Sequence, residues 1–253
     1  MTESKNTSHI IKVSGITKRY PKAETNSLSE VSFDVFRGEK LGVFGPNGAG
    51  KTTLISILSG ILPQTSGEVN YFIDNESANF KKILPKIGFV PQDFALYQEL
   101  TATQNLRYFG KMHGLKNPEL EQKISFLLTI LGLDHVGNRK LATFSGGMKR
   151  RINLAIGLIN DPEILFLDEP TVGVDVQSKV AIMTLLNDLN AKGTTMIYTS
   201  HHLREAEDFC DRTLLLDNGR IIAEGTLNDL LKQHNAESLE DLLIHLTGKA
   251  LRD

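Results

Sequence analysis

The stretch from Leu41 to Leu54, LGVFGPNGAGKTTL, constrains the fold of this chain more than any other feature. Its apolar start, Leu41 to Phe44, predicts a buried strand, and the apolar spacing from Leu54 to Leu58 predicts a helix. Between them stands the spacing G-x-x-x-x-G-K-T. There, glycines let backbone N–H groups turn toward phosphate, and the helix adds its positive dipole end. We therefore predict a phosphate-binding loop; the alternative is a glycine-rich turn that binds nothing.

The residues of this loop are expected to contribute differently to binding. Lys51 would reach the β and γ phosphates of a nucleotide, and the hydroxyl of Thr52 would ligate Mg²⁺. The nucleotide-binding residues expected in this stretch are Gly45, Pro46, Asn47, Gly48, Ala49, Gly50, Lys51, Thr52 and Thr53.

Length and composition exclude several classes of protein. The 253 residues suit one sizeable domain, or one domain with a small appendage. A net charge of −2 does not fit a nucleic-acid-binding surface, so no nucleic-acid partner is expected, and we interpret Lys149-Arg150-Arg151 as the solvated start of a helix. Cys210 is the only cysteine, which excludes an intrachain disulfide and favours a reducing compartment; we interpret it as a small buried hydrophobe.

The sequence predicts no direct insertion into a membrane. Apolar stretches such as Ala155 to Ile159 fall far short of the roughly 20 residues that a spanning helix needs. The first residues, MTESKNTSH, contain no apolar signal region, so we expect the chain to be neither exported nor inserted on its own. Any membrane role is expected to come through a partner.

Alternating and apolar runs predict strands on both sides of the loop. Ile10 to Val13 and Val31 to Phe36 indicate a small antiparallel sheet near the N-terminus. Further strands are expected at Glu68 to Ile73, Ile87 to Val90 and Thr194 to Thr199, and a hairpin is expected around Asn218-Gly219. Tyr20 would stack on an adenine ring or be a loop tyrosine of no consequence, and the residue alone does not decide.

Helical spacing dominates from Phe94 to Thr143 and again after residue 145. Thr101 and Gln104 form a capping box, so we interpret the first region as an insert of several helices. An amphipathic helix carrying Val180, Met183, Leu186 and Leu189 is expected later in the chain. Two short helices are expected at the C-terminal end of the chain. The leucine stripe of this appendage would pack back on the domain or contact a partner.

Two element ends carry groups suited to phosphate chemistry. Ser145-Gly146-Gly147 precedes a helix, whose first N–H groups could bind an anion. Taken alone, however, these three residues are better explained as an ordinary junction between a loop and a helix. Ile164 to Leu167 predicts a fully buried strand with Asp168 and Glu169 at its carboxyl end, where α/β sheets place ligands. Asp168 would hold Mg²⁺ and Glu169 would act on a water, unless the acids simply cap the strand into solvent.

In their order along the chain, these features resemble the ATP-binding subunit of an ATP-binding-cassette (ABC) transporter. The matches are Gly45 to Thr53 (Walker A), Gln92 (Q-loop), Ser145 to Met148 (signature), Ile164 to Glu169 (Walker B), Thr171 to Asp175 (D-loop), His201 (switch histidine) and Tyr20 (adenine-stacking aromatic). Phe144 and Met148 depart from the commonest signature, LSGGQ, and Val174 from the usual D-loop leucine, which puts the branch in question.

The resemblance implies an α/β fold of the P-loop NTPase (RecA-like) type. Its core would have a mainly parallel sheet, with an N-terminal antiparallel β subdomain and an inserted α-helical subdomain. The implied ABC ATPase domain is 1–226, with core 1–93 and 160–226 and helical subdomain 94–159, followed by a C-terminal helical appendage, 227–253.

The resemblance also implies ATP hydrolysis by a head-to-tail pair of cassettes, expected to be a homodimer. Glu169 would orient or activate water, His201 would hold the γ-phosphate, and Lys51 would stabilise charge. The implied metal ligands are Thr52, Gln92 and Asp168, and Tyr20, Gln92, Asp175 and, across the dimer, Ser145, Gly146 and Gly147 would complete the nucleotide site.

The movement of dimer closure would be transmitted to a transmembrane permease subunit on a separate chain. The segment Phe94 to Leu100 would contact this permease. The implied location is cytoplasmic, peripheral on the inner face of the cell membrane. The segments Thr171 to Gly173 and Ser238 to Asp241 resemble the bacterial drug and antibiotic exporter branch.

Three other classes of protein fit the sequence less well. A soluble ABC ATPase with a non-transport role usually has paired cassettes or a long coiled coil, and neither is present. A small-molecule kinase would not explain Ser145 to Gly147 before the acidic strand end. A Rossmann dehydrogenase is excluded because Gly45-x-x-Gly48-x-Gly50 is not G-x-G-x-x-G.

Overall fold

The computed structural model describes residues 8–200 and 203–248. The chain divides into two compact units, one formed by residues 1–83 with 195–253 and the other by residues 84–194. Within the described part of the chain, every helix is too short or too polar to cross a bilayer.

The first unit contains the antiparallel sheet that the N-terminal alternation predicts. Its strands are β1 (His9–Lys18), β2 (Leu28–Phe36), β4 (Ser66–Ile73) and β5 (Glu76–Ala78), in the order β2-β1-β4-β5. All three pairings are antiparallel. The alternating residues Val31, Phe33 and Val35 are buried, as a sheet with one covered face requires.

The first unit also contains the strand that leads into the glycine-rich loop. This strand, β3 (Lys40–Phe44), pairs in parallel with β8 (Thr195–Thr199) and β9 (Arg212–Asp217), and β9 pairs with β10 (Arg220–Gly225) in an antiparallel hairpin. Every residue of β8 is buried, which fits a strand covered on both faces. The hairpin turn has positive φ at Asn218 (47°) and Gly219 (73°), the geometry that an Asn-Gly turn favours.

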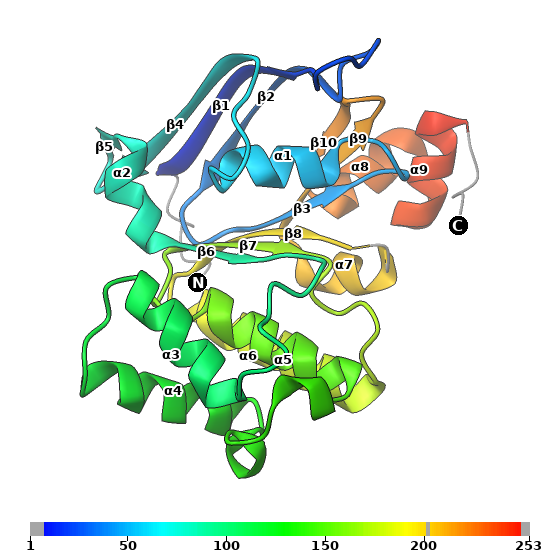
Figure 1. Ribbon diagram of the computed structural model, residues 1–253. Helices are drawn as coiled ribbons and strands as arrows, with labels where there is room; N and C mark the ends of the chain where they lie inside the picture. The colour runs from blue at the N-terminus through cyan, green and yellow to red at the C-terminus, as the bar shows by residue number, and fades with distance from the viewer. Residues whose placement is uncertain (1–7, 201–202, 249–253) are drawn as a thin grey trace, which may run out of the picture. The chain divides into compact units, whose positions relative to one another are not determined.

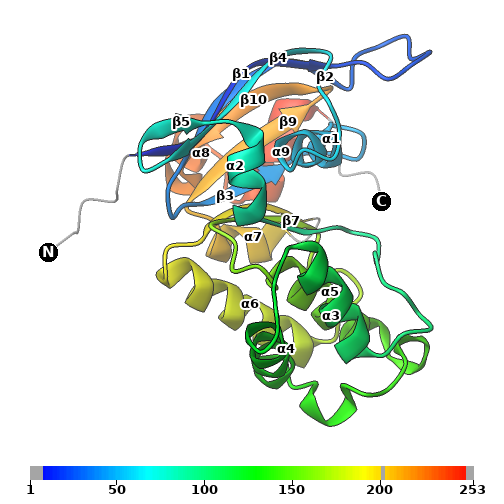
Figure 2. The ribbon, with the colours of Figure 1, turned by 60° about the vertical axis from the view of Figure 1, so that its left-hand side comes forward.

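Helices cover the strands of the first unit. Figure 1 shows α1 (Lys51–Leu58) between the antiparallel sheet and β3. Figure 2 shows α2 (Phe80–Ile83) beside β4, where the Phe80 and Tyr71 rings lie 5.6 Å apart. Farther along the chain follow α7 (Leu203–Phe209), α8 (Leu227–His234) and α9 (Leu239–Thr247). Leu239 and Leu242 of α9 are fully buried, so the prediction that this leucine stripe packs back on the domain is confirmed.

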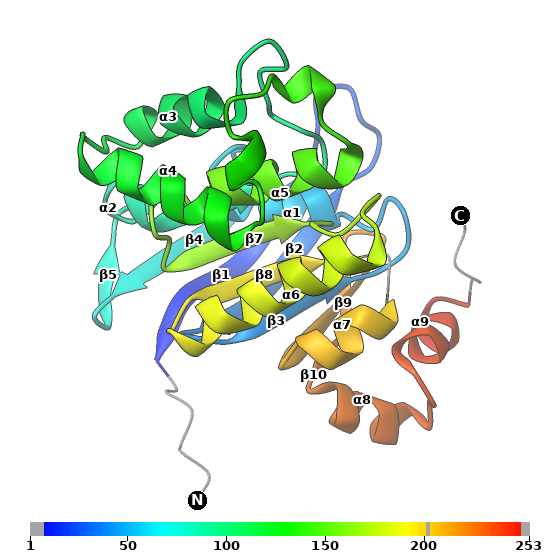
Figure 3. The same cartoon turned by 90° about the horizontal axis from the view of Figure 1, so that it is seen from below.

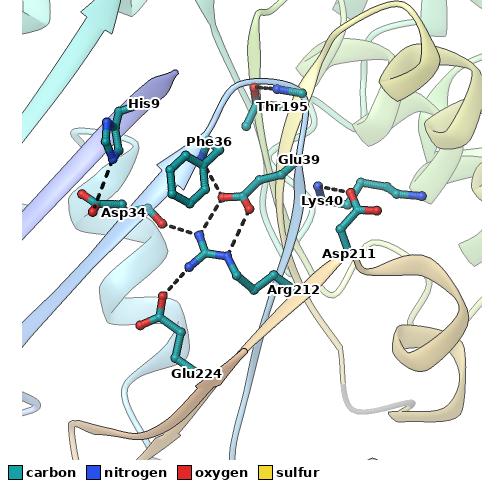
Figure 4. A network of polar contacts seen from close by, with 10 residues as sticks. His9, Asp34, Phe36, Glu39, Lys40, Thr195, Asp211, Arg212 and Glu224 are labelled. Atoms are coloured by element: carbon teal, nitrogen blue, oxygen red, sulfur yellow. Dashed lines mark hydrogen bonds and ion pairs between the residues drawn. The ribbon is translucent and has the colours of Figure 1, made fainter. Parts of the chain in front are cut away.

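Arg212 of β9 joins the two groups of strands in the first unit (Figure 4). Its Nη2 and Nε lie 2.8 and 3.2 Å from the two carboxylate oxygens of Glu39, and Nη1 pairs with Glu224 on β10. Nη2 also donates to the backbone carbonyl of Asp34 on β2, and the guanidinium lies 5.1 Å from the Phe36 ring centre. Burial, opposed by the Arg212 charge, raises the pKa of Glu224.

The second unit contains two parallel strands and most of the long helices. Its strands are β6 (Ile87–Val90) and β7 (Ile164–Asp168), and every residue of β7 is buried. The α-helices are α3 (Ala102–Met112), α4 (Glu119–Ile130), α5 (Gly146–Gly157) and α6 (Val176–Ala191), and the short 3-10 helices are η1 (Leu84–Lys86), η2 (Asp134–Val136) and η3 (Leu141–Thr143). Figure 3 shows α3, α4 and α5 packed together.

The capping box at the start of α3 is confirmed. The Thr101 hydroxyl accepts from the Gln104 N–H at 3.1 Å, and the Gln104 side chain accepts from the Thr101 N–H at 2.9 Å. The helical texture predicted between Phe94 and Thr143 is therefore present, with its first α-helix beginning at Ala102.

Two interpretations of single side chains were wrong. Arg150 is only 4% exposed, so the basic run does not form a solvated helix start at that position. Val180 on α6 is 61% exposed, because the buried face of this helix is the one that carries Ile182 and Leu186. Cys210 agrees in part with its interpretation: the residue as a whole is half-buried, while burial raises the pKa of its thiol and an added Cβ at Gly42 would lie 2.8 Å from its Sγ.

Candidate functional site

The glycine-rich loop joins β3 to α1 in the first unit, and two of its glycines lie where no larger residue fits. A Cβ at Gly45 (φ 154°) would lie 2.0 Å from the Leu216 carbonyl oxygen, and one at Gly50 (φ 107°) would lie 2.6 Å from the Ser27 carbonyl oxygen. Gly50 is also the N-cap of α1, and no side chain caps it. The first-turn N–H groups of α1 therefore remain suited to an anion.

Lys51 is buried and folds back over this loop. Its Nζ donates to the carbonyl oxygens of Gly45 at 2.8 Å and Pro46 at 3.1 Å, while Asn47, Gly48 and Thr52 beside it are exposed. A positive charge held among exposed loop residues and helix N–H groups favours a polyanionic ligand. The residues predicted for the phosphate loop are thus brought together as expected.

The turn between β9 and β10 is hydrogen-bonded to the glycine-rich loop. The Gly219 N–H donates to the Ala49 carbonyl at 3.0 Å, and the Gly219 carbonyl accepts from the Ser29 N–H at 2.8 Å. This turn was not among the predicted site residues. Nothing in the Asn-Gly pattern could have indicated it, because the contact joins residues far apart in the chain.

Tyr20 lies beside the same helix. Its hydroxyl is 3.3 Å from the Thr53 hydroxyl, and its ring is 40% exposed. The ring centre is 5.5 Å from Lys18 Nζ, which helps to hold it. An exposed ring fixed next to the phosphate loop suits stacking on a nucleotide base.

The second unit carries the acidic strand end. Asp168 is 2% and Glu169 3% exposed, and Glu169 has φ 51°, a left-handed conformation that costs a non-glycine residue roughly 1–2 kcal/mol. Gln92 Nε2 donates to Glu169 Oε2 at 2.9 Å. The structure therefore brings together the predicted Q-loop glutamine and the predicted catalytic acid.

Arg150 of α5 completes this cluster, and the sequence analysis missed it. Its Nη1 donates to the carbonyls of Pro91 at 3.2 Å and Gln92 at 2.8 Å. Burial lowers the pKa of Arg150, and the negative charges of Glu169, Asp93 and Asp168 oppose that change. Helical spacing was an available signal, because Gly147, Arg150 and Leu154 share the buried face of α5.

The predicted signature and D-loop lie side by side in this unit. Ser145 is the N-cap of α5, and its hydroxyl accepts from the Met148 N–H at 3.3 Å. Asp175 is the N-cap of α6; hydrogen bonds from the Ser178 N–H and hydroxyl, at 2.9 and 2.7 Å, lower the pKa of Asp175. A Cβ at Gly147 would lie 3.3 Å from Asp175 Oδ2, so glycine permits this approach.

The predicted site residues are divided between the two units. Tyr20 and Gly45 to Thr53 belong to the first unit, whereas Gln92, Ser145 to Gly147, Asp168, Glu169 and Asp175 belong to the second. His201, the predicted switch histidine, lies outside the described residues. Chemically, the first set can bind phosphate oxygens and the second can place a carboxylate against a water molecule.

Known proteins share these features in sequence and in structure. The sequence pattern of the family described as "ABC transporter" matches residues 28–172. The linearmycin resistance ATP-binding protein LnrL of Bacillus subtilis is 42% identical over 93% of this chain and 75% of its own length. For the Nod factor export ATP-binding protein I of a Rhizobium species, the identity is 38%, over 88% of this chain and 73% of its own length.

Solved structures agree with this family match. An ATP-binding subunit of an ABC transporter superposes with a TM-score of 0.84 at 30% identity, covering 94% of this chain and 99% of that one. A dimeric ATP-binding cassette in a post-hydrolysis state, bound to ADP and Pi, superposes with a TM-score of 0.78 at 31% identity, covering 86% of this chain and 99% of that one. The predicted P-loop NTPase fold and ATPase activity are confirmed.

Since the family match covers more than half of the chain and contains both the loop around Lys51 and the strand that ends at Asp168, this chain belongs to the ABC transporter family as an ATP-binding, ATP-hydrolysing subunit.

Proposed function

We propose that this chain powers export through a membrane permease, by ATP-driven head-to-tail closure of two cassettes. The observation that carries the proposal is the 2.9 Å hydrogen bond from Gln92 to the buried carboxylate of Glu169. Gln92 lies two residues before the partly exposed segment Phe94 to Leu100, so one bond links the acid of hydrolysis to a surface suited to a permease. The names of the relatives that act in drug resistance and Nod factor export support the direction of transport.

In this proposal, the residues of the first unit bind ATP. Lys51 and the α1 N-terminus bind the phosphate oxygens, and the exposed ring of Tyr20 stacks on the adenine. Thr52, Gln92 and Asp168 would hold Mg²⁺, which would neutralise charge on the phosphates. The buried acid of Asp168 and the exposed Thr52 hydroxyl have the oxygen chemistry that this ion prefers.

The residues of the second unit promote hydrolysis and complete the partner's site. Glu169 accepts the hydrogen bond from Gln92 with one oxygen and orients or activates the attacking water. Ser145 to Gly147 close over the nucleotide of the second copy, beside Asp175. His201 holds the γ-phosphate.

The proposed partners are a second copy of this chain and a separate permease, with the cassette peripheral at the cytoplasmic face of the membrane. Exposed Phe94, Tyr97 and Tyr108 offer an aromatic surface for the permease. The proposed domain division keeps 1–226 as the ATPase domain, with core 1–93 and 160–226 and helical subdomain 94–159, and keeps 227–253 as the appendage.

Replacing Glu169 with glutamine tests this proposal. Glu169→Gln preserves the shape of the side chain and its bond to Gln92 but removes the basic carboxylate. We expect normal ATP binding, loss of steady-state ATP turnover, and an ATP-dependent dimer on size-exclusion chromatography. Chelation of Mg²⁺ should likewise abolish turnover of the unchanged protein.

The matched control is Glu163→Gln, which changes an acid that precedes the same strand β7 and pairs with Lys86. It should retain turnover. Wild-type ATPase activity in Glu169→Gln would sink the assignment of the catalytic acid. Failure of the full chain to co-purify with a membrane-spanning protein would favour the alternative, an ABC ATPase with a non-transport role.

A further inference from the structure

The segment that follows β6 has its shape set by side chains of α5. At Pro91 the chain leaves β6, and proline has no N–H with which to continue a ladder. The Pro91 carbonyl accepts from Arg150 Nη1 at 3.2 Å and from Asn153 Nδ2 at 2.9 Å, and the Gln92 carbonyl accepts from Arg150 Nη1 at 2.8 Å. Two consecutive backbone carbonyls are therefore held by one helix.

The side chain of Gln92 is exposed, so packing does not fix its direction. Its amide nevertheless meets Glu169 Oε2 at 2.9 Å. An exposed glutamine keeps its side-chain rotamer freedom, so the position of its backbone decides which atoms its amide can reach. The anchor here is Arg150, whose guanidinium carbon lies 4.7 Å from the centre of the Phe94 ring.

We propose that Arg150 is a positioning residue for ATP hydrolysis: it fixes the backbone at Pro91 and Gln92, so that the Gln92 amide holds Glu169 in its working orientation. The inference rests on the proposed role of Glu169. Among the described residues, Arg150 donates its hydrogen bonds to the carbonyls of Pro91 and Gln92 and not to Glu169, so in this proposal it acts through Gln92.

A contribution to the stability of the fold does not explain why an arginine is buried at position 150. It is 4% exposed, and its Nε has no partner among the described residues, which makes it a costly cation to bury. A hydrophobic residue of similar volume would pack there at less cost. The placement instead serves the two carbonyls and neutralises an environment that contains Asp93, Asp168 and Glu169.

Arg150 also connects two parts of the predicted site. It lies on α5, the helix that Ser145 caps at its N-terminus, and the C-terminal end of this helix packs against β6. A Cβ at Gly157 would lie 2.5 Å from Val90 Cγ2 and 3.2 Å from the Phe89 carbonyl, so α5 and β6 approach closely. A displacement of the Ser145 end would thus reach Gln92 through Arg150.

The test compares Arg150→Met with Arg151→Met in the full chain. Arg151 is the next residue of α5, and its Nη1 donates at 2.8 Å to a different carbonyl, that of Leu131. For Arg150→Met we expect kcat to fall about 10- to 100-fold, the range for a catalytic group displaced by about 1 Å, with ATP Kd and KM within about twofold of wild type. For Arg151→Met, kcat should stay within about twofold of wild type.

A double-mutant cycle separates positioning from a general structural effect. If Arg150 acts through Gln92, then Gln92→Ala with Arg150→Met should lower kcat no further than Gln92→Ala alone. Independent, multiplicative losses would overturn the inference, and so would wild-type kcat in Arg150→Met. Should Arg150→Met not fold, Asn153→Ala removes the other side-chain hydrogen bond to the Pro91 carbonyl, and an unchanged kcat there would show that anchoring this backbone does not position Gln92, which would overturn the inference.

The result for Glu169→Gln distinguishes this inference from the proposed function. If that variant is inactive while Arg150→Met is normal, only the role of Arg150 is wrong. If Glu169→Gln retains turnover, the proposed catalytic acid is wrong whatever Arg150 does.

Discussion

Replacing Gly219 with alanine tests whether the β9–β10 turn sets the shape of the phosphate loop. The Gly219 N–H holds the Ala49 carbonyl at 3.0 Å, and its carbonyl is held by Ser29 at 2.8 Å. Gly219 has φ 73°, and a Cβ there would lie 2.6 Å from the Ser27 carbonyl oxygen and 2.9 Å from its carbon. The added methyl group must push the turn away from Ser27, and the bond to Ala49 moves with it.

The magnitude follows from two contributions. A left-handed conformation costs a non-glycine residue roughly 1–2 kcal/mol. Weakening the two backbone hydrogen bonds costs about 1 kcal/mol each. We therefore expect Gly219→Ala to lower the free energy of unfolding by about 3–4 kcal/mol. The bond to Ala49 must be re-formed for the loop to bind phosphate, so ATP affinity should fall about five- to tenfold.

Gly15→Ala is the matched control. Gly15 has φ 60°, and a Cβ there would meet nothing within 4 Å, so only the conformational cost of roughly 1–2 kcal/mol applies. Urea unfolding gives the stabilities, and titration with a fluorescent ATP analogue gives the affinities. Gly15→Ala should keep wild-type affinity. If the two variants lose equal stability and bind ATP equally well, the turn does not support the loop and our reasoning is refuted.

Two further predictions concern stability away from the site. Because burial raises the pKa of Glu224, the folded state holds that proton more tightly than the unfolded state, so the carboxyl stabilises the fold at low pH and loses this effect as pH rises through its folded pKa. The Tm of Glu224→Gln relative to wild type should therefore rise between about pH 4 and pH 7, and a constant difference would contradict this. Thr101→Ala removes the capping box of α3 and should lower the unfolding free energy by about 1 kcal/mol, measured in urea; the exposed Thr143→Ala serves as its control, and equal losses would count against the cap.

Local sequence patterns predicted those elements that are determined by residues close together in the chain. The strand at Ile164 to Asp168 and the cap at Thr101 depend on neighbouring residues, and both are present. The separate roles of Gln92 and Glu169 came from the family resemblance, whereas the hydrogen bond between them was not predicted, because no local rule joins positions so far apart.

Tertiary context decided what the sequence analysis missed. Arg150 was interpreted from its charge, although its helical phase places it on the buried face of α5. The apolar spacing correctly included the buried Leu186, but Val180 of the same spacing lies outside the covered face of α6, because the width of that face depends on what packs against the helix. Gly219 reaches the phosphate loop only because β9 pairs with β3.

The two carbonyl contacts of Lys51 have a consequence for ligand selection. An arriving phosphate competes with the oxygens of Gly45 and Pro46, which already accept from the ammonium group. The affinity that Lys51 adds is therefore the difference between its hydrogen bonds to phosphate and its hydrogen bonds to the two carbonyls. This difference is smaller than the affinity that an otherwise unbonded lysine would add by forming the same ion pair. A ligand that presents several charged oxygens at once wins this exchange more easily than one that presents few. The loop's internal bonding thereby favours a polyphosphate chain over a single phosphate.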